Sequence, residues 1–251
     1  MTIMEAWIAD RAPPGRSGLV FSVYMVLSRA MFGLGQLSIA LADPRGLALL
    51  VLAAAAYLLA PFVPTAVSAP PPPIGKRNLS GLLELPRQVP VAAIGSFVHA
   101  AVTVTAVSLL PVWGLARGLS VERIALTLVT IQGGGILFQI LIGPLSDRFD
   151  RRIVMACTSA AGALLALAGP LTPGLPQVPA ALLMGAWVGC TFVLYALAAA
   201  YMTDVSRPDQ RMAWSSSLLL LWGLVSVVGP MLGALAMDHF GADALFGFIG
   251  L

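Results

Sequence analysis

Charged side chains are scarce in this sequence of 251 residues. Asp, Glu, Lys and Arg together make up 10% of it, while hydrophobic residues make up 59%. Ordinary soluble domains carry about 25% charged residues. A chain with so few charges cannot cover the surface of a water-soluble domain, so that class of protein is excluded.

Cysteine and histidine are also rare, with two of each. Cys157 and Cys190 lie apart in apolar segments, which indicates buried free thiols rather than a disulfide framework or a metal site. His99 and His239 are still farther apart, and the apolar segments contain no HExxH motif and no acidic pair. An intramembrane enzyme needs such clusters, so that function is disfavoured, and no metal or cofactor is indicated.

The sequence is instead rich in long apolar segments. They are roughly 20 residues or longer, the length that an α-helix needs to cross about 30 Å of hydrocarbon. Peptide groups in lipid must be hydrogen-bonded internally, so these segments predict a helical bundle. We expect an all-α polytopic membrane protein with seven full transmembrane helices and a partial eighth that begins near Ala242. The seven spans are 18–42, 46–67, 89–115, 121–143, 152–170, 178–202 and 212–237.

The basic residues alternate between the two sides of the predicted membrane. Ten of the fourteen Lys and Arg residues fall on the side of the N-terminus and three on the other, with Arg29 inside a span. Because positive charges favour the cytoplasmic side, this pattern predicts a multi-pass plasma-membrane protein with a cytoplasmic N-terminus, rather than nucleic acid binding. The ten are Arg11, Arg16, Lys76, Arg77, Arg87, Arg148, Arg151, Arg152, Arg207 and Arg211.

The longest polar interruption, residues 69–88, contains four consecutive prolines followed by Lys76 and Arg77. This composition is typical of a linker, here a cytoplasmic one. It divides the chain into residues 1–68, with two spans, and residues 89–251, with six spans of which the last is incomplete.

The region of the first span is repeated near the end of the chain. Three pairs share an offset of 194 positions: Asp10 with Asp204, Pro14 with Pro208, and Gly35 with Gly229. One period of the repeat contains six spans, which predicts a parent of twelve helices. The spans before the linker would be helices five and six, and those after it helices seven to twelve, so we expect an N-terminally truncated chain.

The break between the fourth and fifth spans reads GPLSDRFDRR, and so many charges in a short loop indicate that helix ends are locked together there. The loop resembles the one between helices eight and nine of the major facilitator superfamily, whose pattern is close to G-x-x-x-D-R-x-G-R-R. Asp150 stands where the family usually has Gly, and Asp is among the few residues that tolerate the left-handed conformation. The matching residues are Gly143, Asp147, Arg148, Arg151 and Arg152.

The resemblance implies a transporter of two six-helix bundles that rock around a site near the middle of the membrane. The phrase from Ala12 to Gln36 is most similar to the bacterial sugar and efflux branch of the family. This similarity implies a protein of the bacterial inner membrane that takes up or exports a small solute, coupled to protons. The solute would be drug-like, sugar-like or an anionic metabolite.

The resemblance also implies that the charged loop is a conformational latch. Asp147 would dock at the N-terminal end of the first span, where the helix dipole and Arg16 both attract a carboxylate. The three arginines of the motif would pair with lipid phosphates and with carboxylates such as Asp204, whose counterpart in the repeat is Asp10. The alternative is that these arginines only orient the chain in the membrane.

Polar residues inside the spans are unevenly distributed, and such residues tend to face the interior of a bundle or a cavity. The spans at 46–67 and 152–170 have few of them. In the family, helices five, seven, eight, ten and eleven line the cavity, and the more polar spans correspond to these. The expected cavity residues are Ser22, Arg29, Gln36, His99, Thr103, Gln132, Gln139, Tyr195 and Trp222.

Arg29 is the leading candidate for substrate binding, because it lies near the middle of its span, where a lone charge is costly. Its partner would be an acid in the absent helices or the substrate, which would then be anionic or rich in acceptors. His99 could relay a proton or donate a packing hydrogen bond. Gln132 and Gln139 do not titrate and would line the cavity or bond between helices.

A stretch rich in Gly and Pro runs from Gly223 to Gly233. It resembles a segment that antiporters of the family carry in helix five, although here it falls in the presumed helix eleven. The alternative is close helix packing through small residues. The residues expected to pack in this way are Gly35, Gly229, Pro230 and Gly233.

Three functions remain open from the sequence. The first is secondary transport with a small-molecule substrate and protons as partners in a lipid bilayer. The second is a truncated fragment that transports nothing by itself. The third is an intramembrane enzyme, which the rarity of His, Cys and acidic residues in the spans disfavours.

Overall fold

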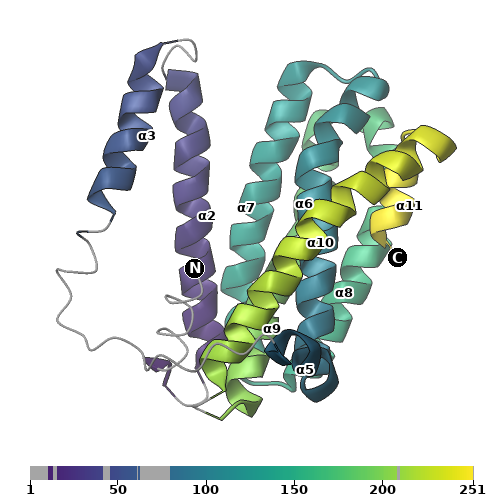
Figure 1. The fold of residues 1–251 in the computed structure, drawn as a ribbon. Coiled ribbons are helices and arrows are strands. Elements are labelled where there is room, and N and C mark those ends of the chain that lie inside the picture. Colours follow the sequence, from purple (N-terminus) through teal and green to yellow (C-terminus); the bar gives the residue numbers. More distant parts are fainter. Residues whose placement is uncertain are drawn as a thin grey trace.

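The computed structural model describes residues 11–13, 16–41, 46–60, 62, 80–207 and 210–250, and every secondary-structure element in those ranges is a helix. The side chains of residues 17, 32, 33, 35–41, 80–83, 121 and 212 lie outside the description. The elements (Figure 1) are α2 (Ser17–Leu41), α3 (Leu47–Leu59), α5 (Ser80–Gln88), α6 (Pro90–Ala116), α7 (Val121–Ser146), α8 (Arg151–Leu167), η1 (Gly169–Gly174), α9 (Gln177–Val205), α10 (Arg211–Phe240) and α11 (Ala244–Gly250).

Four helices in the described part of the chain, α6, α7, α9 and α10, are long and apolar enough to cross a membrane. Two shorter apolar stretches, Gly18–Met31 in α2 and Leu47–Leu59 in α3, fall within two further expected spans. The remaining expected span contains α8, which ends at Leu167 and is followed by the 3-10 helix η1, where Pro170 lacks the N–H that an α-helix would use. The molecule is an all-α polytopic membrane protein, as the sequence predicts.

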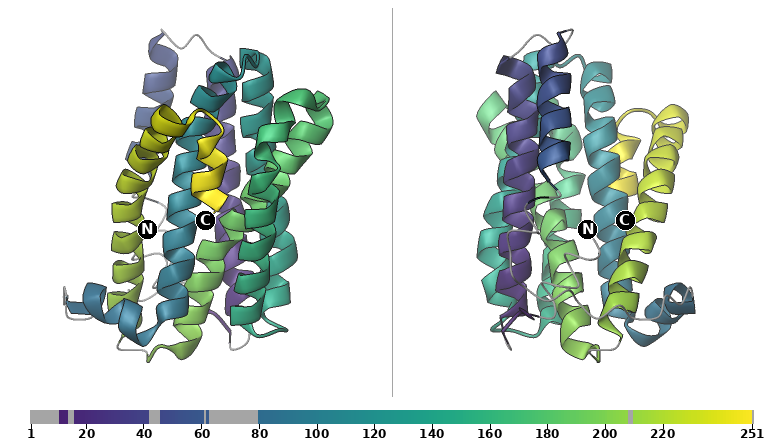
Figure 2. Two further views of the ribbon diagram at one scale, coloured as in Figure 1. Left: turned by 90° about the vertical axis from the view of Figure 1, so that its right-hand side faces the viewer. Right: turned by 60° about the vertical axis from the view of Figure 1, so that its left-hand side comes forward.

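The central helix of the bundle is α9, and α2, α6, α7 and α8 pack around it (Figure 1, Figure 2). In its most apolar stretch 83% of the residues are buried, compared with 17% in α7 and in α10. Small residues such as Ala196, Ala198 and Ala200 are almost fully buried and allow the neighbouring helices to approach closely. Residues on every face of α9 therefore contact other helices.

Large apolar side chains also cover the outside of the bundle. No residue of α3 is buried, and Leu224, Val227 and Met231 of α10 are each more than half exposed. Monomeric soluble proteins rarely expose contiguous apolar surface on this scale. Lipid is the solvent that such a surface requires.

The last part of the expected linker is helical. α5 covers residues 80–88, and its Leu85 is fully buried against Trp214 and Leu218 of α10. The helix ends at Val89, whose backbone leaves the helical region, and Pro90 begins α6, a position at which proline is well tolerated. The expected end of the linker, residue 88, is also the last residue of α5. Residues 80–88 nevertheless pack on the helices that follow the linker.

The start of α8 corrects an expectation about Asp150. Its φ of −59° and ψ of 118° lie outside the left-handed region that the family's glycine suggested. Its side chain accepts a hydrogen bond of 2.9 Å from the backbone N–H of Arg152, so Asp150 is the N-cap of α8. Aspartate is tolerated here because it caps a helix.

Candidate functional site

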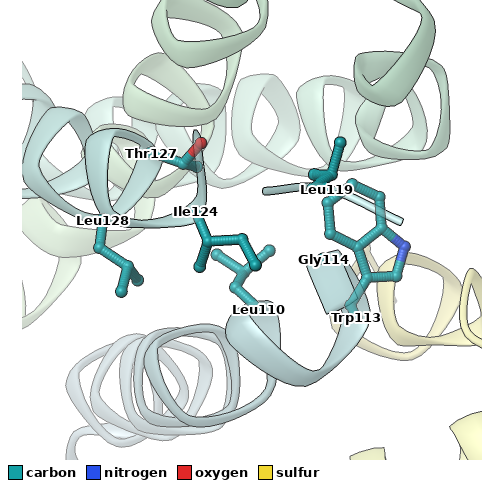
Figure 3. Close-up of a pocket in the computed structure, with 7 residues that line it drawn as sticks. All are labelled: Leu110, Trp113, Gly114, Leu119, Ile124, Thr127 and Leu128. Atoms are coloured by element: carbon teal, nitrogen blue, oxygen red, sulfur yellow. The ribbon is translucent and has the colours of Figure 1, made fainter. Parts of the chain in front are cut away.

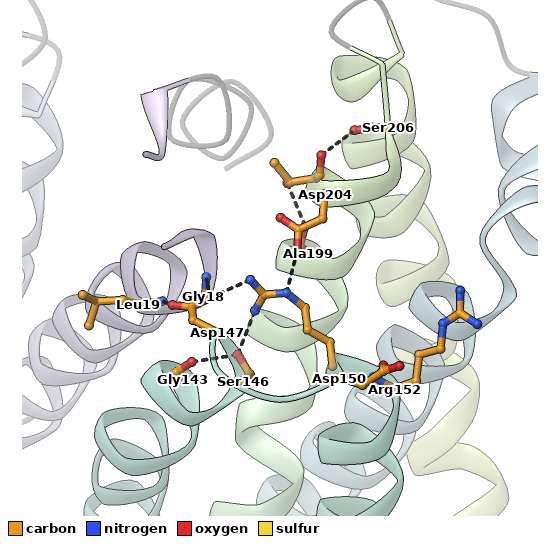
Figure 4. A network of polar contacts seen from close by, with 12 residues as sticks. Gly18, Leu19, Gly143, Ser146, Asp147, Asp150, Arg152, Ala199, Asp204 and Ser206 are labelled. Atoms are coloured by element: carbon orange, nitrogen blue, oxygen red, sulfur yellow. Dashed lines mark hydrogen bonds and ion pairs between the residues drawn. The ribbon is translucent and has the colours of Figure 1, made fainter. Parts of the chain in front are cut away.

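A network of polar contacts joins α2, α7, α8 and α9 where α7 turns into α8 (Figure 4). The Asp147 carboxylate accepts hydrogen bonds from the backbone N–H groups of Gly18 and Leu19, each at 2.9 Å. These N–H groups belong to the first turn of α2, where the helix dipole favours an anion. Asp147 therefore lies at the place where the sequence analysis put it.

Arg151 is the centre of this network and is only 8% exposed. Its Nη2 lies 2.6 Å from Asp147 Oδ1, and its Nε donates to Asp204 Oδ2 at 2.6 Å. Its Nη1 donates to Ser146 Oγ at 2.8 Å. Charge-assisted bonds of this kind are stronger than neutral ones, so Arg151 ties the end of α7 to α9 and, through Asp147, to α2. We call Gly18, Leu19, Ser146, Asp147, Arg151 and Asp204 the loop network.

Two glycines allow the helices to meet at this point. A Cβ added to Gly18 would lie 2.5 to 2.7 Å from Ser146 Oγ, Arg151 Nη1 and Asp147 Oδ1. A Cβ added to Gly143 would overlap the Ser22 side chain. Close packing against Ser22 thus explains why the first position of the loop motif is glycine. Ser22 was expected in the cavity, but it is buried against α7 beside the loop network.

The remaining motif residues lie outside the loop network. Arg148 is exposed. The Arg152 guanidinium carbon is 5.3 Å from the centroid of the Tyr201 ring, within the range of a cation–π contact. Asp10 lies outside the described residues. Of the three arginines expected to pair with carboxylates, the structure therefore shows Arg151 with Asp204 and places the other two at the surface.

A second polar cluster lies in the middle of the bundle, around Arg29. The guanidinium carbon of Arg29 is 3.4 Å from the centroid of the Phe192 ring, so the cation rests on the aromatic face. Arg29 Nε is buried and has no hydrogen-bond partner within the described part of the chain. A guanidinium held this way keeps a donor direction open for a ligand.

His99 of α6 approaches the same aromatic residues of α9. Its ring centroid is 6.2 Å from that of Phe192 and 5.6 Å from that of Tyr195. Its Nδ1 lies 2.9 Å from the carbonyl oxygen of Thr191, and the Thr103 hydroxyl is 3.4 Å from the same nitrogen. A carbonyl oxygen can only accept, so Nδ1 carries the hydrogen in this contact and the neutral ring leaves Nε2 as an acceptor.

Gln139 of α7 completes the group, which we call the mid-bundle cluster: Arg29, His99, Gln139, Phe192 and Tyr195. The Gln139 side chain is fully buried, and its Nε2 donates to the Phe192 carbonyl at 2.9 Å. Its Oε1 has no partner within the described part of the chain, and the same is true of Gln132 Oε1. Four expected cavity helices, α2, α6, α7 and α9, thus contribute to one cluster.

The other expected residues are placed as follows. Trp222 of α10 is partly buried and packs against an apolar group that includes Phe21, Met25 and Tyr195. The Gln36 side chain and the surroundings of Gly35 lie outside the description. Trp222 thus lies at the border of the mid-bundle cluster, next to the group that contains Tyr195.

The glycines of α10 lie against α6. A Cβ on Gly229 would be 2.8 Å from Thr105 Oγ1, and one on Gly233 would be 2.7 Å from Thr105 Cγ2. Pro230 lies within α10, whose helix continues on both sides of it. These contacts agree with the packing alternative for the Gly- and Pro-rich stretch.

A small cavity between α6 and α7 is no candidate for a solute site (Figure 3). Its volume of about 10 Å³ is close to that needed for a single water molecule. Its lining is almost entirely apolar and includes Leu110, Trp113 and Ile124.

The sequence analysis missed three residues that the structure brings into these sites. Phe192 lies under the Arg29 cation, Ser146 accepts a hydrogen bond from Arg151, and Gly18 leaves room for Ser146, Asp147 and Arg151. Phe192 precedes Tyr195 by three positions, so both rings lie on one face of α9, a spacing that could have indicated an aromatic pair. Nothing local marks Ser146 or Gly18, because their partners are distant in the sequence.

An apolar helical bundle with a charged loop network at one end and an arginine at its middle defines a polytopic membrane protein. The chain belongs to the major facilitator superfamily, whose family model matches residues 1–196 and 92–251.

Similar proteins carry the same family description. The chain is 34% identical over 143 residues to the uncharacterized MFS-type transporter YfkF of Bacillus subtilis, covering 56% of this chain and 36% of that protein. It is 27% identical over 169 residues to the uncharacterized MFS-type transporter YcaD of Escherichia fergusonii, covering 67% of this chain and 43% of the relative. YcaD of Shigella flexneri gives the same identity and coverage. The chain thus spans about two fifths of the length of these relatives.

Proposed function

We propose that the chain works in secondary active transport of a small solute by alternating access, coupled to protons. The observation that carries this proposal is the Arg29 guanidinium, which lies in mid-bundle on the Phe192 ring and whose buried Nε has no hydrogen-bond partner among the described residues. Membership of the family and similarity to MFS-type transporters support it. The protein would lie in a bacterial inner membrane with the loop network on the cytoplasmic side.

The substrate would bind at the mid-bundle cluster as an anion or as a molecule rich in hydrogen-bond acceptors. Arg29 Nε supplies a donor and a positive charge, while the Tyr195 and Phe192 rings supply apolar surface. The side-chain oxygens of Gln139 and Gln132, which have no partner in the part of the chain that the structure describes, would accept from a hydroxyl or amine of the substrate. An anionic metabolite, a sugar-like molecule with acidic groups and an acidic drug all fit this set.

Protons would be exchanged at His99. Its Nδ1 is engaged by the Thr191 carbonyl, which fixes the ring and leaves Nε2 to take up and release a proton. A substrate anion on Arg29 and a proton on His99 would lie against the same Phe192 ring. Binding of one would favour the other through opposite charge.

The loop network would act as the latch of the transport cycle. In the present conformation it joins α2, on one side of the linker, to α7 and α9, on the other. Opening the bundles at this end must break the Asp147 bonds to Gly18 and Leu19. The network would therefore stabilise the state that is closed at this end.

The test is transport by everted membrane vesicles from bacteria expressing this chain. A mixture of isotope-labelled organic acids, sugar acids and acidic drugs is offered with and without a pH gradient, and accumulated label is identified by mass spectrometry. We expect gradient-dependent accumulation that Arg29→Gln lowers by about tenfold or more, because a hydrogen bond to a charged group is lost. The control is Arg87→Gln, an exposed arginine of α5. Equal accumulation by the Arg29→Gln and control vesicles would contradict the role of Arg29.

The second candidate is a chain that does not transport alone. It is favoured by α3, in which no residue is buried, and by the lack of any extensive contact of α3 with the other described helices. Vesicles that contain the chain and accumulate nothing above vesicles without it would favour this candidate over transport.

A further inference from the structure

A groove on the outside of the bundle lies between α7 and α8 and reaches α9 at its base. Its volume is about 400 Å³, far larger than that of the cavity between α6 and α7. Phe138 and Ile142 of α7 form one wall, Ile153 and Ala161 of α8 form the other, and Cys190 of α9 lies at its base. Neither the loop network nor the mid-bundle cluster includes these side chains.

The lining of the groove calls for an apolar occupant. Among the described residues that line it, Asp150 is the only charged one, and it lies at the loop end of the groove. Elsewhere its polar groups are bonded or weakly polar, since the Thr158 hydroxyl donates to the Val154 carbonyl and Cys157 and Cys190 carry thiols. Phe149 and Ile153 are each 61% exposed at its edge. On the surface of a membrane-spanning bundle an apolar groove faces lipid rather than water, so hydrocarbon fills it.

The length of the groove matches one leaflet. From Ile153 to Ala161 the α8 wall rises about 12 Å, and half of the hydrocarbon core is about 15 Å. The groove begins at the α7–α8 loop, which carries Asp150, and ends near the middle of the bundle. It therefore has the depth that an acyl chain reaches when its headgroup lies at the loop.

The charge beside the groove favours an anionic headgroup. Arg148 and Arg152 are exposed on either side of Asp150, whose carboxylate already accepts the N–H of Arg152. Arg151 is bound by the carboxylates of Asp147 and Asp204. The positive charge at the surface of the loop therefore comes from Arg148 and Arg152. Arginine is well suited to phosphate recognition, and basic residues at the membrane surface attract anionic lipids.

We propose that this groove is a binding site for one acyl chain of an anionic phospholipid, with the phosphate held at the α7–α8 loop by Arg148. The site is separate from the proposed transport pathway, and it is expected whether or not the chain transports alone.

The site can be tested with the purified protein in nanodiscs of dioleoylphosphatidylglycerol mixed with dioleoylphosphatidylcholine. Lipid that stays bound after detergent extraction is identified and counted by native mass spectrometry. We expect one retained phosphatidylglycerol per protein. Ala161→Trp should abolish its retention by filling the groove, whereas Ala160→Trp, at an exposed alanine of α8 that does not line the groove, should leave it unchanged.

The headgroup is tested separately with Arg148→Gln, and Arg87→Gln is the control for the lost charge. We expect Arg148→Gln to lower the preference for phosphatidylglycerol over phosphatidylcholine about fivefold while lipid remains bound. Equal retention by Ala161→Trp and Ala160→Trp would overturn the site. An unchanged preference in Arg148→Gln would overturn the assignment of the headgroup to Arg148.

Discussion

The Asp147 carboxylate accepts a hydrogen bond from the backbone N–H of Gly18 at 2.9 Å, across 129 positions of the sequence. The first turn of α2 contains no acidic residue of its own. Its positive end is therefore neutralised by a carboxylate from the α7–α8 loop, a tertiary contact in place of a local cap. That distant side chain attaches the start of α2 to the rest of the bundle.

Asp147→Asn should weaken this attachment. The amide keeps one oxygen but loses the negative charge that both α2 and Arg151 use, so we expect a loss of about 2 kcal/mol in the free energy of unfolding. The measurement is unfolding in mixed micelles titrated with sodium dodecyl sulfate. Asp238→Asn, at an exposed aspartate of α10, is the control and should change the value by less than about 0.5 kcal/mol. Equal effects of the two variants would contradict the contact.

Gly143→Ala should destabilise the protein because the new Cβ would overlap Ser22. Overpacking of this kind costs about 1 to 3 kcal/mol. Gly133→Ala, on the same helix, meets nothing within 4 Å and should be neutral or stabilising by up to about 1 kcal/mol, since alanine favours helix. Thermal unfolding of the two variants in one detergent separates them, and similar melting temperatures would refute the close approach.

Arg151 and Asp204 should be energetically coupled. A double-mutant cycle of Arg151→Ala and Asp204→Ala should give a coupling free energy of about 1 to 3 kcal/mol, as expected for contacting members of one network. The same cycle with Arg152→Ala in place of Arg151→Ala should give a value near zero, because Arg152 lies against Tyr201. A coupling no larger than that of the Arg152 cycle would show that the ion pair contributes little.

The cation–π contact predicts coupling between Arg29 and Phe192. Phe192→Leu removes the aromatic face, and a cycle with Arg29→Met should give a coupling of about 2 kcal/mol in a desolvated site. Phe138→Leu combined with Arg29→Met provides the control, since Phe138 lines the outer groove. Unfolding free energies of the single and double variants supply the measurement, and equal couplings for both phenylalanines would argue against the contact.

The cap at Asp150 can be tested at a single position. Asp150→Ala removes the acceptor and should cost about 1 kcal/mol, whereas Asp150→Asn keeps an oxygen in place and should cost little. Hydrogen exchange at the Arg152 amide reports the bond directly. Protection of that amide in Asp150→Ala equal to that in the unmodified chain would rule out the cap.

Much of the fold could be predicted from the sequence because lipid imposes a simple rule. Backbone in hydrocarbon must be hydrogen-bonded internally, and apolar segments of about 20 residues satisfy this as helices, so their length and spacing predict α6, α7, α9 and α10. The early end of α8 was not predicted, since an apolar run does not reveal where a proline such as Pro170 changes the helix type. The packing of Leu85 on α10 was missed for a different reason, because one apolar residue in a polar segment gives little signal.

The candidate sites were predictable to the extent that they depend on single unusual residues. Arg29 and Asp147 stand out because a charge inside an apolar span, or an acid in a basic loop, has few explanations. Phe192 does not stand out among many apolar residues, and its role follows only from where Arg29 is placed in three dimensions. The left-handed conformation expected for Asp150 was wrong, because a family's glycine need not be replaced by a residue of the same backbone geometry. The roles of Arg29, His99 and the loop network in transport stay predictions.

Two polar connections join α2 and α9. Arg29 of α2 lies on Phe192 of α9, and Gly18 of α2 is linked to Asp204 of α9 through Asp147 and Arg151. On α2, Gly18 and Arg29 are separated by about 16 Å along the axis, and on α9, Phe192 and Asp204 are separated by about 18 Å. The two helices are thus connected at two places, at the middle of the bundle by Arg29 on Phe192 and at one end through Asp147 and Arg151. If one helix tilts relative to the other about either connection, the other connection is strained. The geometry at Arg29 and Phe192 is therefore coupled to the geometry at Gly18 and Asp204.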